Sequence, residues 1–137
     1  MAGSTFTGCV NLEYCEMPET LLLINRYAFR QTGLTQIVFN NGLQEIGQGA
    51  FGALKKGINV LKIPGSVRII GAQAFAANSV KLGELVFGGV GDPTQIETVY
   101  KDSFTQGGGK DFSSVTYYAT SIPDENIKGI LSVIENV

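Results

Sequence analysis

A pattern of 15 residues recurs along the chain, and this recurrence constrains the fold more than any other feature of the sequence. Residues 61–75 read L-K-I-P-G-S-V-R-I-I-G-A-Q-A-F, and residues 15–29 read C-E-M-P-E-T-L-L-L-I-N-R-Y-A-F. The two segments share a proline at Pro18 and Pro64, apolar residues at matching positions and a final Ala-Phe. A period between about 20 and 50 residues indicates stacked repeat units.

Further copies follow the same pattern. Residues 37–51 keep the apolar positions and the final Ala-Phe, with Asn40 where the proline would be, and residues 85–104 hold the pattern around an insertion that contains G-G-V-G-D-P. Partial copies lie at 6–12 and 113–118. The four copies end at phenylalanines separated by 22, 24 and 29 residues, namely Phe29, Phe51, Phe75 and Phe104. We expect these rings to stack as a ladder.

Each unit has a simple physical interpretation. The alternation in L-K-I is typical of a short strand with one buried face, and Pro or Asn then ends it. The following V-R-I-I forms a second short extended piece, Gly71 permits a tight backbone turn, and Ala-Phe points into the interior. A single unit cannot bury its own apolar face, so neighbouring units must stack.

The sequence therefore predicts one leucine-rich-repeat domain over residues 1–137: a repeat solenoid, mostly β, with one short parallel strand per turn, short helical or extended returns and a C-terminal capping helix. Its predicted parts are a partial repeat at 6–12, repeats at about 13–34, 35–57, 58–82 and 83–112, a last strand at 113–118 and a cap helix at about 122–136.

The two ends differ. Ser121 is a candidate N-cap with Pro123 in the first turn, and the residues that follow form one apolar stripe at helical spacing, made of Ile127, Ile130, Leu131 and Ile134. We favour a cap for the stack over a partner-binding helix. The N-terminal end has no such cap and starts within a repeat, with Phe6 as its first core residue. We therefore expect the chain to be part of a longer chain or of an assembly.

The segment I-P-G-S-V-R-I-I-G-A-Q-A-F at 63–75 resembles the BspA-type leucine-rich repeat, with a consensus of roughly L-x-x-I-x-I-P-x-S-V-x-x-I-G-x-x-A-F-x-x-C. The resemblance extends from about Phe6 to Tyr118. Departures are the insertion before Ile96, Tyr100 for the glycine, Ser103 for the alanine and Asn40 for the proline. The resemblance implies that the chain is related to secreted or surface-attached adhesins of bacteria and some protists, and to phage virion proteins.

Composition narrows the partner classes. With 44% hydrophobic residues the chain can bury a core, and a net charge of −2 gives no pull toward nucleic acid or an anionic membrane. No run of 18 apolar residues and no secretion signal occur, so the sequence predicts no membrane insertion and leaves localisation open between cell surface and virion. Residues 26–81 carry seven basic residues and the single acid Glu45, whereas both ends are acidic. This is either chance clustering, which we favour, or a surface for an acidic partner or for head-to-tail contact between copies.

Catalytic chemistry is not indicated. The chain has no histidine, so the usual triads are impossible, and we expect no enzyme, no cofactor and no metal site. Cys9 and Cys15 are interpreted as buried free thiols. The run T-Q-G-G-G-K at 105–110 lacks phosphate-loop spacing, and the nearby aspartates lack calcium-loop spacing.

Outward residues of the predicted strands form two columns that we take as the candidate partner-binding face. The first column contains Tyr14, Gln36, Val60, Glu84 and Ser114, and the second contains Glu16, Val38, Lys62, Val86 and Thr116. Val38, Val60 and Val86 would form an exposed apolar cluster, as at a contact surface, although valine is also favoured in strands for its own sake.

Two functions fit these observations. The first is a non-enzymatic protein-binding or adhesion module that uses the parallel-sheet face. The alternative is a structural subunit of a phage virion or cell-surface assembly, docked through its uncapped N-terminal coil. In both, the expected partner is a protein, either another protein or a further copy of the chain.

Overall fold

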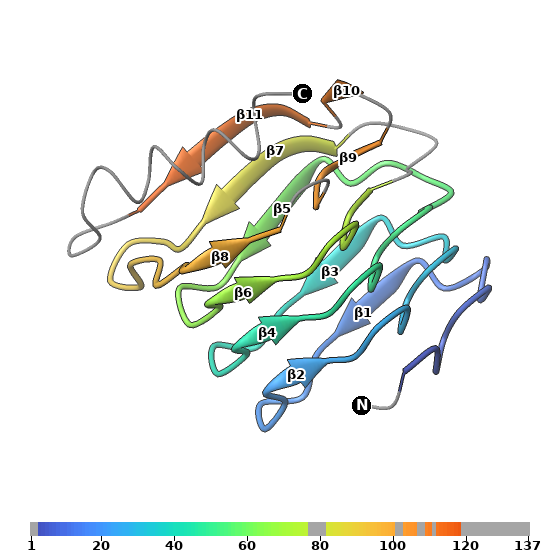
Figure 1. Cartoon of the computed structure of the whole chain (residues 1–137), viewed down its shortest axis with the longest axis horizontal. Helices are drawn as coiled ribbons and strands as arrows, with labels where there is room; N and C mark the ends of the chain where they lie inside the picture. The colour runs from blue at the N-terminus through green and yellow to red at the C-terminus, as the bar shows by residue number, and fades with distance from the viewer. Residues whose placement is uncertain (1–2, 77–81, 101–102, 107–108, 111, 119–137) are drawn as a thin grey trace.

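The computed structural model describes residues 3–76, 82–100, 103–106, 109–110 and 112–118. No helix occurs within these ranges, and the predicted cap helix at 122–136 lies outside them. The chain winds in successive coils that stack side by side, and the four coils between residues 14 and 99 each have one strand on either face (Figure 1).

One face carries the longer strands. They are parallel and separate into two sheets: β1 with β3, and β5 with β7 and β11. Their bounds are Tyr14–Glu16 for β1, Gln36–Val38 for β3, Val60–Ile63 for β5, Leu82–Phe87 for β7 and Phe112–Tyr117 for β11. The parallel strands predicted from the repeats are thus present, but β3 and β5 are not hydrogen-bonded neighbours.

The opposite face carries a continuous parallel sheet in the order β2-β4-β6-β8. Its two-residue strands are Leu23–Ile24, Glu45–Ile46, Ile69–Ile70 and Thr98–Val99. The returns in the described coils are therefore extended. A short antiparallel pair, β9 (Thr105–Gln106) and β10 (Gly109–Lys110), follows the last of these strands.

A third set of hydrogen bonds joins the turns that contain the Ala-Phe pairs. The backbone N–H groups of Phe29, Phe51 and Phe75 donate to the carbonyl groups of Ala50, Ala74 and Ser103 on the next coil, at 2.8, 2.7 and 2.7 Å. Two residues before each of these rings the backbone has a positive φ near 60°, at Tyr27, Gly49 and Gln73. The repeated left-handed residue gives each turn the same shape, so that consecutive turns can bond in register.

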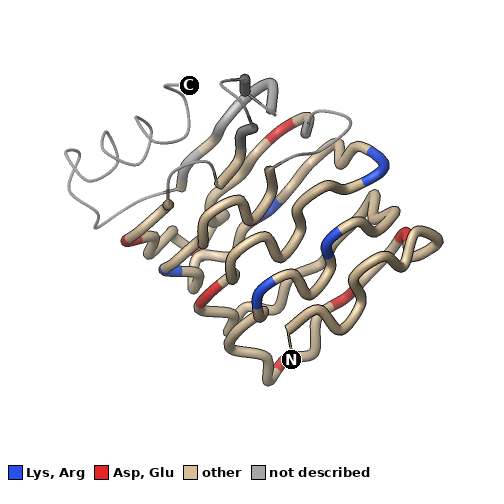
Figure 2. The backbone as a smooth tube through the Cα atoms, turned by 45° about the vertical axis from the view of Figure 1, so that its right-hand side comes forward, with Lys and Arg blue, Asp and Glu red and all other residues tan. Residues whose placement is uncertain are grey.

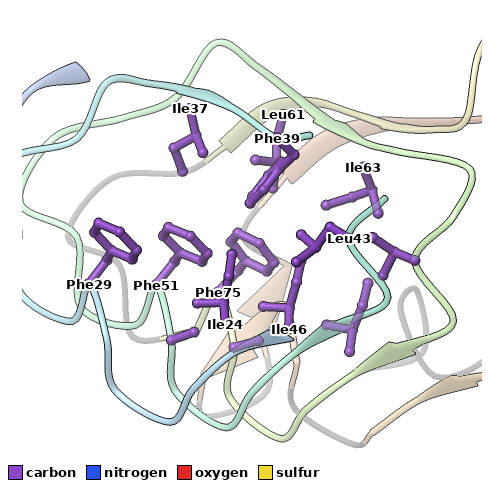
Figure 3. Packing of buried hydrophobic residues seen from close by; sticks show 14 of the residues in the cluster. Ile24, Phe29, Ile37, Phe39, Leu43, Ile46, Phe51, Leu61, Ile63 and Phe75 are labelled. Carbon is purple, nitrogen blue, oxygen red and sulfur yellow. The ribbon is translucent and has the colours of Figure 1, made fainter. Parts of the chain in front are cut away.

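Phenylalanine rings form a ladder through the interior, as predicted. Consecutive rings are stacked with centroids 5.1 to 5.2 Å apart and planes within 13° of parallel, in the order Phe6, Phe29, Phe51, Phe75 and Phe104. Figure 3 shows three of these rings in a row. From the strand side, the rings of Phe39 and Phe87 meet the ladder edge-on. The core is therefore a continuous stack shared by all described coils.

The glycine of the repeat has a different role from the one we inferred. Gly47 and Gly71 do not have positive φ; the left-handed residue lies two positions later. A Cβ at Gly71 would lie 2.7 Å from the backbone nitrogen of Gln48, and one at Gly47 would lie 2.7 Å from the carbonyl oxygen of Ile24. At Gly47 and Gly71, glycine therefore allows consecutive coils to approach closely.

Phe75→Ala removes a ring that stacks on both neighbours and is fully buried. We expect the free energy of unfolding to fall by roughly 3 to 5 kcal/mol, as for other large-to-small core changes. Urea denaturation measures the loss. Phe6→Ala is the matched control, because Phe6 stacks on one side only and is 37% exposed. Equal losses in the two variants would contradict a continuous ladder.

Gly71→Ala places a methyl group against the backbone of the preceding coil. We expect a loss of about 1 to 3 kcal/mol in unfolding free energy, the usual range for overpacking. Gly89→Ala is the control, since a Cβ there meets no atom within 4 Å and the backbone φ is not positive. Thermal unfolding of both variants, followed by circular dichroism, tests the difference. A neutral Gly71→Ala would show that the coils can separate at little cost.

Candidate functional site

The two outward columns lie on the face formed by β1, β3, β5, β7 and β11. The strand register places Tyr14 beside Gln36 in one part, and Val60, Glu84 and Ser114 side by side in the other. In the second column, Glu16 lies beside Val38, and Lys62, Val86 and Thr116 are neighbours. The break between β3 and β5 therefore divides each column into two groups.

Val86 is not exposed, and our expectation for it was wrong. Its side chain is only 8% accessible, whereas Val38 and Val60 are 38% and 46% accessible. Val86 lies on the central strand β7, flanked in its row by the longer Lys62 on β5 and by Thr116 on β11. The exposed valines of this face thus reduce to one on each side of the break.

The break has a cause in loop length. Val60 comes nine residues after Phe51, whereas Gln36 comes only seven residues after Phe29. The two added residues enter before β5, so they displace this strand from β3 but leave the opposite face in register. The longer loop is anchored elsewhere: the Lys55 N–H donates to the Thr32 carbonyl at 3.0 Å, and Lys56 forms an ion pair with Glu13.

A groove of about 470 Å³ lies along this break. Its walls are formed by residues of β3 and β5, by the segments that follow these strands and by the inserted loop after β7: Gln36, Ile37, Val38, Phe39, Asn41, Val60, Lys62, Ile63, Pro64, Gly88 and Asp92. We name it the β3/β5 groove. It contains apolar surface together with amide side chains and two charges.

The two charges of the β3/β5 groove are not equivalent. The carboxylate of Asp92 accepts a hydrogen bond from the backbone N–H of Gly65 at 3.0 Å, which ties the inserted loop to the preceding coil. Lys62 is exposed and forms no ion pair with any residue in the described part of the chain. Its ammonium group is therefore available to an anionic group in the groove.

A second hollow of about 530 Å³ adjoins the groove and shares Val38, Phe39 and Asn41 with it. Asn40 lines this hollow and is 7% exposed. Its Nδ2 donates to the carbonyl groups of Leu21 at 2.7 Å and Glu19 at 3.3 Å, whereas its Oδ1 is buried and has no hydrogen-bond partner among the described residues. We did not predict a role for Asn40, although a polar residue at the proline position of the repeat was the signal that could have indicated one.

The first coil forms an apolar end to the stack. One face of the Phe6 ring packs on Phe29, and the side chains of Phe6 and Val10 are both substantially exposed. Around this end, the hydrogen bond and charge of Lys56 hold the pKa of the Glu13 carboxyl below its usual value. Desolvation and the neighbouring Glu16 carboxylate raise the pKa of the Tyr14 hydroxyl, which donates to that carboxylate at 3.2 Å.

Both cysteines are free, as predicted, but Cys9 is exposed and not buried. Among the described residues, the first coil has a neighbouring coil on one side only, so the position that would be a core cysteine between two coils is open here. Cys15 in β1 is half-buried, and this burial raises the pKa of its thiol. Both thiols thus belong to the apolar end and not to the groove.

Figure 2 shows the charged residues spread along the coils. In the described ranges, no group of three or more Cys, Asp or Glu side chains is placed to hold a metal ion. The described residues also contain no helix long and apolar enough to cross a membrane.

Comparison with known proteins identifies one family. A family model described as "BspA type Leucine rich repeat region (6 copies)" matches residues 1–130. No similar curated protein and no similar solved structure was found.

Proposed function

The chain belongs to the BspA-type leucine-rich repeat family, whose members are generally protein-interaction or adhesion modules, and we propose that it is itself a non-enzymatic protein-binding module. In this proposal, residues 1–137 form one solenoid with a cap helix at about 122–136, and the face of β1, β3, β5, β7 and β11 binds the partner. Members of the family are typically found at the cell surface or outside the cell, which is where we place the interaction.

The observation that supports this proposal most directly is the β3/β5 groove. Val38 and Val60 are exposed on its two sides, and Lys62 lies beside them without an ion pair among the described residues. Exposed apolar side chains rimmed by polar residues are typical of a surface that contacts another protein. Polar positions of the two columns surround this centre, with Gln36 next to Tyr14 and with Glu84 accepting a hydrogen bond from Thr116.

Site-specific photo-crosslinking tests the proposal. A benzoylphenylalanine placed at Val60 should give a discrete adduct in intact source cells, whereas the same group at Gln44, exposed on the opposite face, should give none. Val60→Asp should abolish capture of the protein identified in this way and leave the circular dichroism spectrum unchanged, because the side chain is outside the core. Gln44→Asp is the matched control. Equal capture by both variants would count against the sheet face as the binding surface.

A second candidate function is that of a structural subunit in a virion or cell-surface assembly. The exposed end of the ladder favours it, since the apolar side chains of Phe6 and Val10 are exposed on the first coil. Stacking of a further coil would cover the free side of Phe6 in the way that Phe29 covers the other.

Sedimentation of the purified chain distinguishes this candidate. If the first coil docks, the chain should associate as concentration rises, and Phe6→Glu should abolish the association. Val90→Glu is the control, because Val90 is 95% exposed in the inserted loop. A monomer at high concentration, with the amide hydrogens of residues 3–12 protected from exchange, would rule out docking through this coil.

A further inference from the structure

Asparagine is followed by glycine at one place in the sequence, Asn41-Gly42, in the segment between β3 and β4. These residues are the central pair of a turn that is closed by the Leu43 N–H, which donates to the Asn40 carbonyl at 3.2 Å. Asn41 is exposed, and its side chain forms no hydrogen bond with any described residue. Within the described ranges, the backbone N–H of Gly42 has no partner either. A side-chain amide and the backbone nitrogen that follows it are thus both free to react.

The reaction open to this pair is the loss of the side-chain amide, for which asparagine counts among the thermolabile residues. The Gly42 nitrogen attacks Cγ of Asn41; a C–N bond forms, the bond from Cγ to Nδ2 breaks, and ammonia leaves with the proton of the Gly42 amide. Water then opens the cyclic imide at either of its carbonyl carbons. One opening gives an aspartyl residue, and the other gives an isoaspartyl residue, whose main chain runs through the side-chain carboxyl carbon. Water is the only co-reactant, and glycine leaves the attacking nitrogen unshielded because it has no Cβ.

The other described asparagines lack this combination. Asn40 is 7% exposed, its Nδ2 donates to two carbonyl groups, and the residue after it carries a side chain. The remaining ones precede leucine, arginine and valine, at Asn11, Asn25 and Asn59. The reaction should therefore be concentrated at position 41.

The fold does not require this reactive pair. The coils before and after have the same turn, closed by bonds of 3.0 and 3.1 Å, with Glu19-Thr20 and Gly65-Ser66 as the central pairs. A Cβ at Gly42 would meet no atom closer than 3.7 Å, and the backbone φ there is not positive. A larger residue at position 42 and a carboxylate at position 41 are therefore both compatible with the turn.

From these observations we propose that Asn41 is a site of spontaneous deamidation in the folded chain, and that the product alters the binding face. Asn41 lines both the β3/β5 groove and the hollow beside it, where the new carboxylate joins Glu16 and Glu19. The chemical step is independent of any partner. Its effect on partner capture rests on the proposed binding function.

Incubation of the purified chain at mildly alkaline pH in water enriched in oxygen-18 tests the chemical step. After digestion in ordinary water, mass spectrometry should find one heavy oxygen at position 41, ahead of Asn11, Asn25 and Asn59, and ammonia should be released in equal amount. A protease that cleaves before aspartyl but not isoaspartyl residues should cut only part of the product, because both openings occur. Conversion only when the chain is unfolded in urea, or equal rates at the other asparagines, would overturn the proposal.

Gly42→Thr is the blocking variant. It introduces the residue found at the equivalent place, Thr20, so we expect it to fold, and its β-branched side chain crowds the attacking nitrogen and should slow conversion about tenfold. Gly89→Thr is the matched control, because Gly89 also has room for a Cβ and follows no asparagine. Equal slowing by both variants would contradict attack by the Gly42 nitrogen. If Gly42→Thr fails to fold, the labelling of the unmodified chain remains decisive.

Asn41→Asp reproduces the charge of the aspartyl product. It should lower capture by the crosslinker at Val60 several-fold, because the added carboxylate competes with the partner for Lys62 in the groove. Gln44→Asp makes the same charge change on the opposite face and should have no effect. Equal capture by these two variants would contradict only the effect on binding. Absence of any adduct at Val60 would remove the proposed binding function and leave the deamidation site standing.

Discussion

Hydrogen bonds between consecutive coils are the interaction on which the rest of this structure depends. Consecutive described coils bond to each other through the turns that carry the phenylalanines and through strands of one or both faces, with strand pairing missing on one face between β3 and β5. The strands on the second face are only two residues long, so they have no stability outside the stack. The ladder of rings works in the same way, because Phe51 is buried only when both Phe29 and Phe75 are in place.

This arrangement limits where the repeat can vary. At Gly47 and Gly71 the preceding coil leaves no room for a Cβ, and the turns have a residue with positive φ at Tyr27, Gly49 and Gln73. The loop before β5 is under no such restriction and has gained two residues. The gain breaks one face between β3 and β5 but not the other. The groove thus results from the two residues added before β5, which leave the second face and the phenylalanine ladder in register.

Much of this could be predicted from the sequence. The spacing of the Ala-Phe pairs predicted the ladder, and the alternation within each unit predicted which strand residues point outward, because both depend on local period alone. The burial of Val86 could not be predicted in this way, since it depends on neighbours from two other coils. The exposure of Cys9 was not predicted because the repeat pattern assumes a coil on both sides, whereas the described residues place a coil on one side of it. The groove and the burial of the Asn40 Oδ1 could not be predicted either. They depend on the three-dimensional packing of neighbouring coils, which the repeat period does not describe.

The break between β3 and β5 also has a mechanical consequence. When force pulls the coils apart along the stack, strand pairing on both faces resists it at the β1/β3 and β5/β7 levels. Between β3 and β5, three interactions remain to resist the force. They are the pairing of β4 with β6 on the second face, the hydrogen bonds between the turns, and the stacking of Phe51 on Phe75. Under tension the chain should therefore yield first at this level, opening like a hinge about the second face, and a ligand that bridges β3 and β5 would brace it.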